Sequence, residues 1–571
     1  MTTSARPSAS LGAAYGPPAP AAEPAGPRRP GWLAPAALVA LALAASLTGL
    51  ANGFTFDDVP IVQDNARVHT LSRWWEIFAM PYWPAEHLGG LYRPLTTLGF
   101  ALQWAAGGGR PVAFHAASIL LYVAVTIAVW RLAALLLARE AAWVAAALFA
   151  VHPVHVEAVG NVVGQAEVLV ALPMILGVAL YIRARRAGPL RWRTVAALLG
   201  LHAVACLLKE HGILLPGLLL AAELTVVADA RPASARARAL LPLFAAMAAV
   251  GVLFIIVRSA VPTVLEAQRA VAPMADFGLG GRFLTMLQVL KEWARLLLWP
   301  AHLSADYSPQ ELEVVDRISL ALVPSLVIAG ALVALVIAVW RRAPVAALGV
   351  AWAAIMLVLV SNLVVPAGIL LAERTLFMPS VGVVLALGAG YAAAERRARD
   401  AGPAARGAGV ALLAGLLVAG VWRSADRQRV WRDNPTLFAQ TVLDAPLSYN
   451  AHRLLAIELF RVHKDAQAER EMRVAMLLFD RDPVLFEDLA ARYQLAGMCQ
   501  HAVPLYEKAI ALDPRRRKPR GYLADCLIQL GRFEEAAAAA RAGLALPRKD
   551  ARFDVLLRAA SESLAARGRA P

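Results

Sequence analysis

Residues 32–51 read WLAPAALVALALAASLTGLA, a stretch without a single charged side chain. An α-helix rises about 1.5 Å per residue, so twenty residues span about 30 Å, the thickness of the bilayer hydrocarbon. The apolar core of a signal peptide is shorter, about 7–15 residues, so we interpret the stretch as an uncleaved first span. The preceding residues 1–31 are rich in Ala, Pro, Ser and Gly. This composition builds no core, and we expect a disordered tail.

Further apolar blocks follow along the chain. They lie at 113–137, 141–156, 162–182, 193–208, 211–229, 239–259, 317–340, 343–364, 375–393 and 406–422. Hydrophobic residues make up 59% of the chain and charged residues 17%, against about 45–50% and about 25% in soluble domains. These numbers exclude a wholly soluble protein. They predict an all-α, polytopic membrane helix bundle of about 11 spans over residues 32–423.

The formal net charge of +15 is carried in part by loops between the apolar blocks. Four loops are rich in arginine, at 183–193, 231–238, 341–342 and 396–406. All four face the cytoplasm if the N-terminus is cytoplasmic, as the positive-inside rule requires. The charge therefore orients a membrane protein, and we expect no nucleic-acid partner. The external face then carries the loops 52–112 and 260–316 and the C-terminal region.

Residues 282–300, RFLTMLQVLKEWARLLLWP, do not fit a membrane span. Lys291, Glu292 and Arg295 lie mid-run, and insertion of one central Lys or Arg costs about 2.5–3.5 kcal/mol. We expect an amphipathic helix on the outer membrane surface, with Trp293 and Trp299 at the interface. The odd number of spans then places the C-terminus outside the cytoplasm.

The C-terminal region, 435–571, repeats with a period typical of tetratricopeptide repeats, about 34 residues. Gly497 recurs as Gly531, and Ala502 as Ala536. The pattern predicts clear units at 485–514 and 520–547, a weaker unit at 450–483, and a capping helix at 550–566. Such arrays offer a concave groove for a polypeptide, although an array that only scaffolds or dimerises the protein is the alternative. The chain has three cysteines and no CxxC pair, so no disulfide framework is predicted.

The first external loop opens with FTFDD at 54–58. Asp57 and Asp58 follow the first span closely, at the depth of the lipid headgroups, where partial desolvation raises the pKa of a carboxylate. A general base for a hydroxyl needs such a group, and the alternative is a hydrated acidic turn. Arg93 in the same loop suits a phosphate or anchors at the headgroups.

Other polar groups map to the same outer face. His152, His155 and Glu157 close the third span, and in principle could hold a metal. The remaining candidates are Gln165, the Lys209–Glu210 pair and the Glu373–Arg374 pair. Charged residues inside apolar sequence are costly unless paired or functional. The topology therefore predicts one polar site at the outer membrane surface, between helices.

Several of these segments, taken together, resemble the transmembrane and tetratricopeptide-repeat O-mannosyltransferases of the GT-C superfamily. They are FTFDD at 54–58, LYRPLTTLGF at 91–100, FHAASILLYV at 114–123, LFAVHPVHVEAVGNVVGQAEVL at 148–169, LLKEHGI at 207–213 and LAERTLFMPSVG at 371–382. The resemblance implies a GT-C-type bundle with a short repeat solenoid. It also implies an integral, multi-pass protein (of the plasma or inner membrane if bacterial) with site and repeats on the non-cytoplasmic side.

The resemblance further implies an inverting glycosyltransferase that moves mannose or a related hexose from a polyprenyl-phosphate carrier to Ser or Thr hydroxyls. Asp57 or Asp58 would take the hydroxyl proton, and Arg93, Lys209 or Arg374 would stabilise the leaving phosphate. The expected partners are the lipid-linked sugar, membrane lipids and a polypeptide in the repeat groove. No cofactor is certain, and a divalent cation is left open. The alternatives are transfer to a glycolipid or polysaccharide, and a non-catalytic membrane scaffold.

Overall fold

The computed structural model describes residues 32–84, 91–261, 277–315, 317–364, 369–546 and 550–567. The expected disordered tail, 1–31, lies outside the described residues, as do residues 262–276 and 316 of the external loop 260–316. The described residues form α-helices and short 3₁₀ or π turns, with no strand among them. The all-α fold class predicted from the sequence is confirmed.

Each predicted apolar block contains one helix of the bundle. These helices are α1 (Leu33–Ser46), α3 (Pro111–Ala134), α4 (Arg139–Ala150), α6 (Gln165–Ala187), α7 (Trp192–Leu208), α8 (Leu215–Thr225), α9 (Ala233–Ala260), α12 (Val323–Val339), α13 (Pro344–Leu357), α14 (Phe377–Ala401) and α15 (Pro403–Gln428). Within the described residues, 7 helices are long and apolar enough to cross a membrane, or up to 8 if the bent pair Arg139–Ala150 and Pro153–Gly160 is one span. The total of about 11 crossings stays a prediction.

Helix packing separates an inner from an outer layer of the bundle. α6 is an inner helix, because 72% of its most apolar 18-residue stretch is buried. The corresponding stretches of the spans that include α12 and α15 are only 11% buried and suit contact with lipid. α13 and α14 cross closely at Gly349 and Gly382. A Cβ on Gly349 would lie 2.4 Å from the Gly382 carbonyl oxygen. Small residues at such crossings let the two backbones approach, which is how apolar helices associate in membranes.

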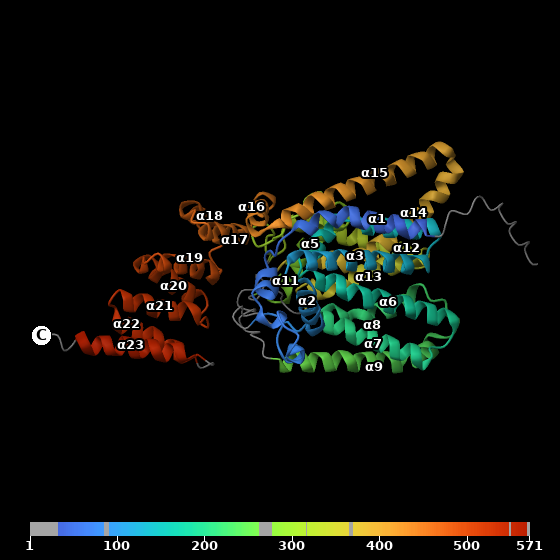
Figure 1. Ribbon diagram of the computed structural model, residues 1–571. Coiled ribbons are helices and arrows are strands. Elements are labelled where there is room, and N and C mark those ends of the chain that lie inside the picture. Colours follow the sequence, from blue (N-terminus) through green and yellow to red (C-terminus); the bar gives the residue numbers. More distant parts are fainter. Residues whose placement is uncertain are drawn as a thin grey trace, which may run out of the picture.

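Short elements gather at the end of the bundle that faces the C-terminal helices (Figure 1). They are η1 (Leu47–Ala51), η2 (Val59–Gln63), η3 (Ala66–Val68), η4 (Trp74–Ala79), α2 (Pro94–Gly107), η6 (Pro153–His155), α5 (Val156–Gly160), η7 (Glu210–Leu214), α11 (Leu279–Leu298), η8 (Leu320–Leu322), η9 (Val358–Val360), η10 (Glu373–Leu376) and η11 (Arg429–Arg432). α11 is the predicted amphipathic helix. It buries Met286, Val289 and Trp293, so one face packs on protein. The prediction that Trp293 lies at the membrane interface is therefore wrong, whereas Phe283 and Trp299, the residue after the helix, are exposed. The position of α11 on a membrane surface stays a prediction.

The C-terminal helices stack into a solenoid beyond that end (Figure 1). They are α16 (Asn434–Asp444), α17 (Tyr449–Arg461), α18 (Asp465–Leu478), α19 (Pro483–Leu495), α20 (Cys499–Leu512), α21 (Lys518–Gln529), α22 (Phe533–Leu544) and α23 (Ala551–Arg567). Gly497 and Gly531, the recurring pair, both adopt positive φ, at 74° and 72°. Both therefore end the first helix of a unit in the left-handed conformation that glycine favours.

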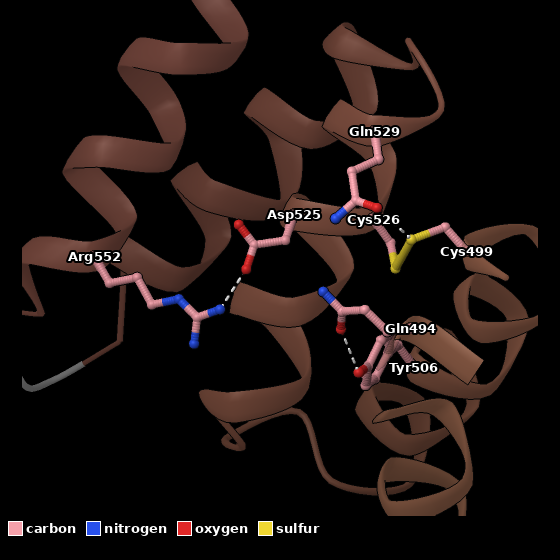
Figure 2. The surroundings of a disulfide bond; sticks show 7 residues. All are labelled: Gln494, Cys499, Tyr506, Asp525, Cys526, Gln529 and Arg552. Atoms are coloured by element: carbon pink, nitrogen blue, oxygen red, sulfur yellow. Dashed lines mark hydrogen bonds and ion pairs between the residues drawn. A yellow bond between two sulfur atoms is a disulfide. The ribbon is translucent and has the colours of Figure 1, made fainter. Parts of the chain in front are cut away.

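A disulfide joins two neighbouring units of the solenoid. Cys499 in α20 is bonded to Cys526 in α21, with their Cα atoms 5.2 Å apart. Figure 2 shows the bond with the Tyr506–Gln494 hydrogen bond and the Arg552–Asp525 ion pair nearby. The sequence analysis predicted no disulfide framework, and this single bond was not foreseen. The spacing of the two cysteines carries no signal for it, because they come together only when the repeats stack.

Candidate active site

An acidic turn, Phe56–Asp57–Asp58, lies at the end of the bundle that faces the repeats. The Asp58 carboxylate is fully buried and accepts hydrogen bonds from the backbone N–H groups of Thr55, Val162 and Val163 at 3.2, 3.2 and 2.8 Å. Asp58 therefore fastens the turn after the first span to the short connection between α5 and α6. Burial raises the pKa of Asp58 to about 7, against the lowering effect of these hydrogen bonds.

Asp57 occupies a different environment from its neighbour. Its side chain is 17% exposed and lies 3.6 Å from the Arg374 guanidinium. Burial raises the pKa of Asp57, while Arg374 and Arg93 oppose that effect. Of the two predicted acids, Asp57 is the one whose side chain is partly exposed.

Arg374 links two acids from distant parts of the chain. Glu157, on α5, accepts hydrogen bonds from the Arg374 backbone N–H at 2.9 Å and from its guanidinium. The neighbouring Glu373 is buried and accepts hydrogen bonds from the Ser304 N–H and the Tyr307 hydroxyl, both at 2.6 Å. These contacts hold η10 against the loop that follows α11.

Two further ion pairs lie beside the first external loop. Arg93 donates from Nε to Glu210 at 3.0 Å and stacks over the Tyr82 ring, 5.0 Å from its centroid. Lys209 is paired with Glu167. Burial lowers the pKa of Lys209 to about 8. Burial alone would raise the pKa of Glu210, but Arg93 brings it down to about 2, so this carboxylate is ionised at neutral pH.

The predicted residues His152, His155 and Gln165 have partners inside the protein. His152 Nε2 lies 3.1 Å from the Leu297 carbonyl oxygen. His155 lies 2.9 Å from the Tyr122 hydroxyl and 2.8 Å from Ser380 Oγ. Gln165 bonds to Gln103, the Phe114 carbonyl and Ser118. Each of these three polar side chains therefore has hydrogen-bond partners within the protein and contributes to the packing between helices.

The metal hypothesis for His152, His155 and Glu157 finds no geometric support. Across the described ranges, no group of three or more His, Cys, Asp or Glu side chains is arranged to hold a metal ion. Glu157 is instead occupied by Arg374. Glu167 and Glu210 are likewise paired with a cation, Lys209 and Arg93.

Several residues at the site carried no signal in the sequence. Ser304 and Tyr307 lie in a polar loop far from any quoted motif, yet both bind Glu373. Asn434, at the start of α16, accepts a hydrogen bond from the Phe56 N–H. Tyr82, whose ring lies under the Arg93 guanidinium, was not singled out either. The first three contacts depend on packing between segments remote in sequence.

Comparison with known proteins agrees with this architecture. A model of the tetratricopeptide repeat matches residues 494–560. The chain is 27% identical to protein O-mannosyl-transferase TMTC3 of Homo sapiens over 374 residues, 59% of this chain and 40% of the relative. It is 27% identical to TMTC4 of Mus musculus over 455 residues, 70% of this chain and 60% of the relative.

The chain is a homologue of the protein O-mannosyl-transferases. Tmtc2 of Drosophila melanogaster adds a stronger local match, 38% identity over 183 residues, which cover 30% of this chain and 20% of the relative. The resemblance predicted from the motifs is thereby confirmed. The matched regions span less than two thirds of the length of these relatives.

Proposed function

We propose that this chain is an inverting glycosyltransferase that moves mannose or a related hexose from a polyprenyl-phosphate carrier to Ser or Thr hydroxyls of proteins. The observation that carries the proposal is the partly exposed Asp57 beside Arg374, in a homologue of protein O-mannosyl-transferases. A base must reach the proton that it takes. Asp57 meets that requirement, whereas Asp58 is buried and occupied by three N–H donors.

The proposed step is a single displacement at the anomeric carbon. Asp57 removes the proton of the acceptor hydroxyl as the oxygen attacks that carbon from the face opposite the phosphate. The bond between the anomeric carbon and the phosphate oxygen breaks, and polyprenyl phosphate leaves with the electron pair. One displacement inverts the configuration at the carbon.

Arg374 is the cation that we assign to the leaving phosphate. During the step, negative charge disappears from Asp57 and appears on the phosphate. A guanidinium that faces Asp57 can stabilise the negative charge that develops on the leaving phosphate. All three cations are paired with a carboxylate: Arg374 with Glu157, Arg93 with Glu210 and Lys209 with Glu167. Of the three, Arg374 is the one within ion-pair distance of Asp57, so we assign Arg93 and Lys209 to the walls of the donor site.

Two observations support a non-cytoplasmic site. The acidic turn and the repeats lie at the same end of the bundle (Figure 1), joined by the Phe56–Asn434 hydrogen bond. The repeats also contain the Cys499–Cys526 disulfide, and disulfides persist mainly in oxidising compartments. With the arginine-rich loops in the cytoplasm, the repeats would then present a polypeptide acceptor to the site.

The activity test uses the purified full chain with a radiolabelled polyprenyl-phosphate sugar. Peptide, glycolipid and polysaccharide acceptors are supplied separately, with and without EDTA. Transfer to Ser or Thr peptides supports the proposal, and transfer confined to a glycolipid or polysaccharide contradicts the assigned acceptor. Asp57→Asn should lower transfer by about 10²-fold or more, whereas Asp64→Asn, an exposed acid of the same loop, is the matched control and should not. A scaffold would transfer nothing.

The orientation test uses single cysteines and an impermeant maleimide on intact cells. Ser72→Cys in the first loop and Ser561→Cys in α23 replace exposed serines near the site and in the repeats. Ser234→Cys lies at the start of α9, beside the arginine-rich loop 231–238. Labelling at 72 and 561 but not at 234 supports the proposed topology. Labelling that separates 72 from 561 contradicts it.

A further inference from the structure

The acidic turn is tied to the junction between the last bundle helix and the first C-terminal helix. Asn52 donates from Nδ2 to the Gln428 carbonyl at 3.0 Å. The Gly53 N–H donates to the Arg432 carbonyl at 2.8 Å. The Phe56 N–H donates to Asn434 Oδ1 at 2.7 Å. Residues 52–56 therefore run along residues 428–434, although more than 370 residues of chain separate the two segments.

Phe56, the first residue of the turn, adopts an unfavourable backbone conformation. Its φ is 53°, in the left-handed region that bulky side chains rarely occupy. Such a conformation persists only where the surroundings enforce it, and it is frequent at functional sites. Phe56 directly precedes Asp57, so its backbone angles set the direction in which the Asp57 carboxylate points.

Two residues of α16 hold Phe56 in this conformation. Asn434 accepts the hydrogen bond from its N–H. The Phe438 ring, one helical turn further on, packs edge-on against the Phe56 ring with the centroids 5.9 Å apart. The hydrogen bond therefore restrains the backbone of Phe56, and the ring contact restrains its side chain.

The amide of Asn434 is itself oriented by the next helix. Its Nδ2 donates to Glu458 Oε1 on α17 at 3.1 Å, which leaves Oδ1 to face Phe56. Glu458 is buried and also paired with Arg461. The first C-terminal helices thus support the turn through a continuous chain of contacts from Glu458 to Asn434 to Phe56.

We propose that Asn434 is a positioning residue, which holds Phe56 in its left-handed conformation and thereby directs Asp57 toward Arg374 and the acceptor hydroxyl. This role rests on the proposed function for its catalytic consequence. It assigns the C-terminal region a second task besides acceptor binding, because the region completes the geometry of the active site. A bundle without α16 would carry every catalytic side chain and still present its base poorly.

The test compares Asn434→Ala, Phe56→Gly and the double variant in the purified full chain. Glycine adopts positive φ without strain, so it needs no enforcement. We expect Asn434→Ala to lower kcat on the order of 10- to 100-fold, as small misplacements of catalytic groups do, with the KM for the donor unchanged. Phe56→Gly added to Asn434→Ala should raise kcat again. Gln440→Ala, a polar side chain on the same helix that bonds to Asp444 of that helix, is the control and should match the wild type.

Hydrogen exchange of the peptide that covers residues 52–58 gives a readout independent of catalysis. Faster exchange in Asn434→Ala, but not in Gln440→Ala, supports the contact even if the wild type transfers no sugar. Wild-type exchange and wild-type kcat in Asn434→Ala would overturn the proposal. So would a loss of activity that Phe56→Gly leaves in place or deepens, because a purely structural defect gives that result.

Discussion

The buried carboxyl of Asp58 should make the stability of this protein depend on pH. Burial raises its pKa from the ordinary 3.8 to about 7 in the folded chain. The folded state therefore holds the proton more tightly than the unfolded state. The stability that protonated Asp58 contributes to the folded state is fully present below pH 3.8 and is lost as the pH rises through about 7. A difference of about 3 pKa units corresponds to about 4 kcal/mol.

Asp58→Asn isolates this effect from every other titrating group. The amide does not ionise, so the variant lacks the cost of a buried charge. It also turns an NH₂ group toward one of the backbone N–H donors, which costs about 1–3 kcal/mol at every pH. As the pH rises from about 4 to about 8, the free energy of unfolding of the wild type should therefore fall by about 4 kcal/mol relative to that of the variant.

The assay is SDS-induced unfolding of the purified full chain in detergent micelles, followed by tryptophan fluorescence at several pH values. The quantity compared is the free energy of unfolding of the wild type minus that of Asp58→Asn. A difference that stays constant across this pH range would contradict the prediction. It would mean that the three N–H donors, and not burial, set the pKa of Asp58.

Three further predictions concern the site and the repeats. Asp57→Asn should lower sugar transfer by about 10²–10⁴-fold, the usual contribution of a general base, with an unchanged melting temperature; near wild-type transfer would exclude Asp57 as the base. Lys209→Met should cost about 3–5 kcal/mol in SDS unfolding because it leaves Glu167 buried and unpaired, and adding Glu167→Leu should restore most of it; two additive losses would contradict this pairing. Replacing Cys499 and Cys526 by Ala should cost the repeats about 2–4 kcal/mol, measured by thermal unfolding under oxidising conditions, and an unchanged midpoint would show that the bond constrains little.

Local sequence patterns were enough to predict the architecture. Uncharged stretches such as 32–51 predict membrane helices because the bilayer requires a fixed apolar length. Recurring pairs such as Gly497 and Gly531 predict stacked helix pairs because each repeat uses the same turn. Both signals are contained within short windows, so neither depends on how distant segments pack.

The gathering of polar residues at one end could also be predicted, because alternating spans return every second loop to the same side. The division of labour among those residues could not. Asp57 and Asp58 are adjacent and chemically identical, yet one faces Arg374 and the other is buried under three backbone N–H groups. His155 is a plausible ligand in sequence and a hydrogen-bonded core residue in the fold.

The apolar blocks, the repeats and the end of the bundle where charge collects follow from the order of the amino acids. Which carboxylate is partly exposed, which cation it meets, and the contact of Asn434 with Phe56 follow only from the packing of the fold. The two groups of features differ in the range of the interactions behind them. Helix formation and membrane insertion respond to neighbouring residues, whereas burial and hydrogen bonding depend on which distant segments fill the space around a side chain.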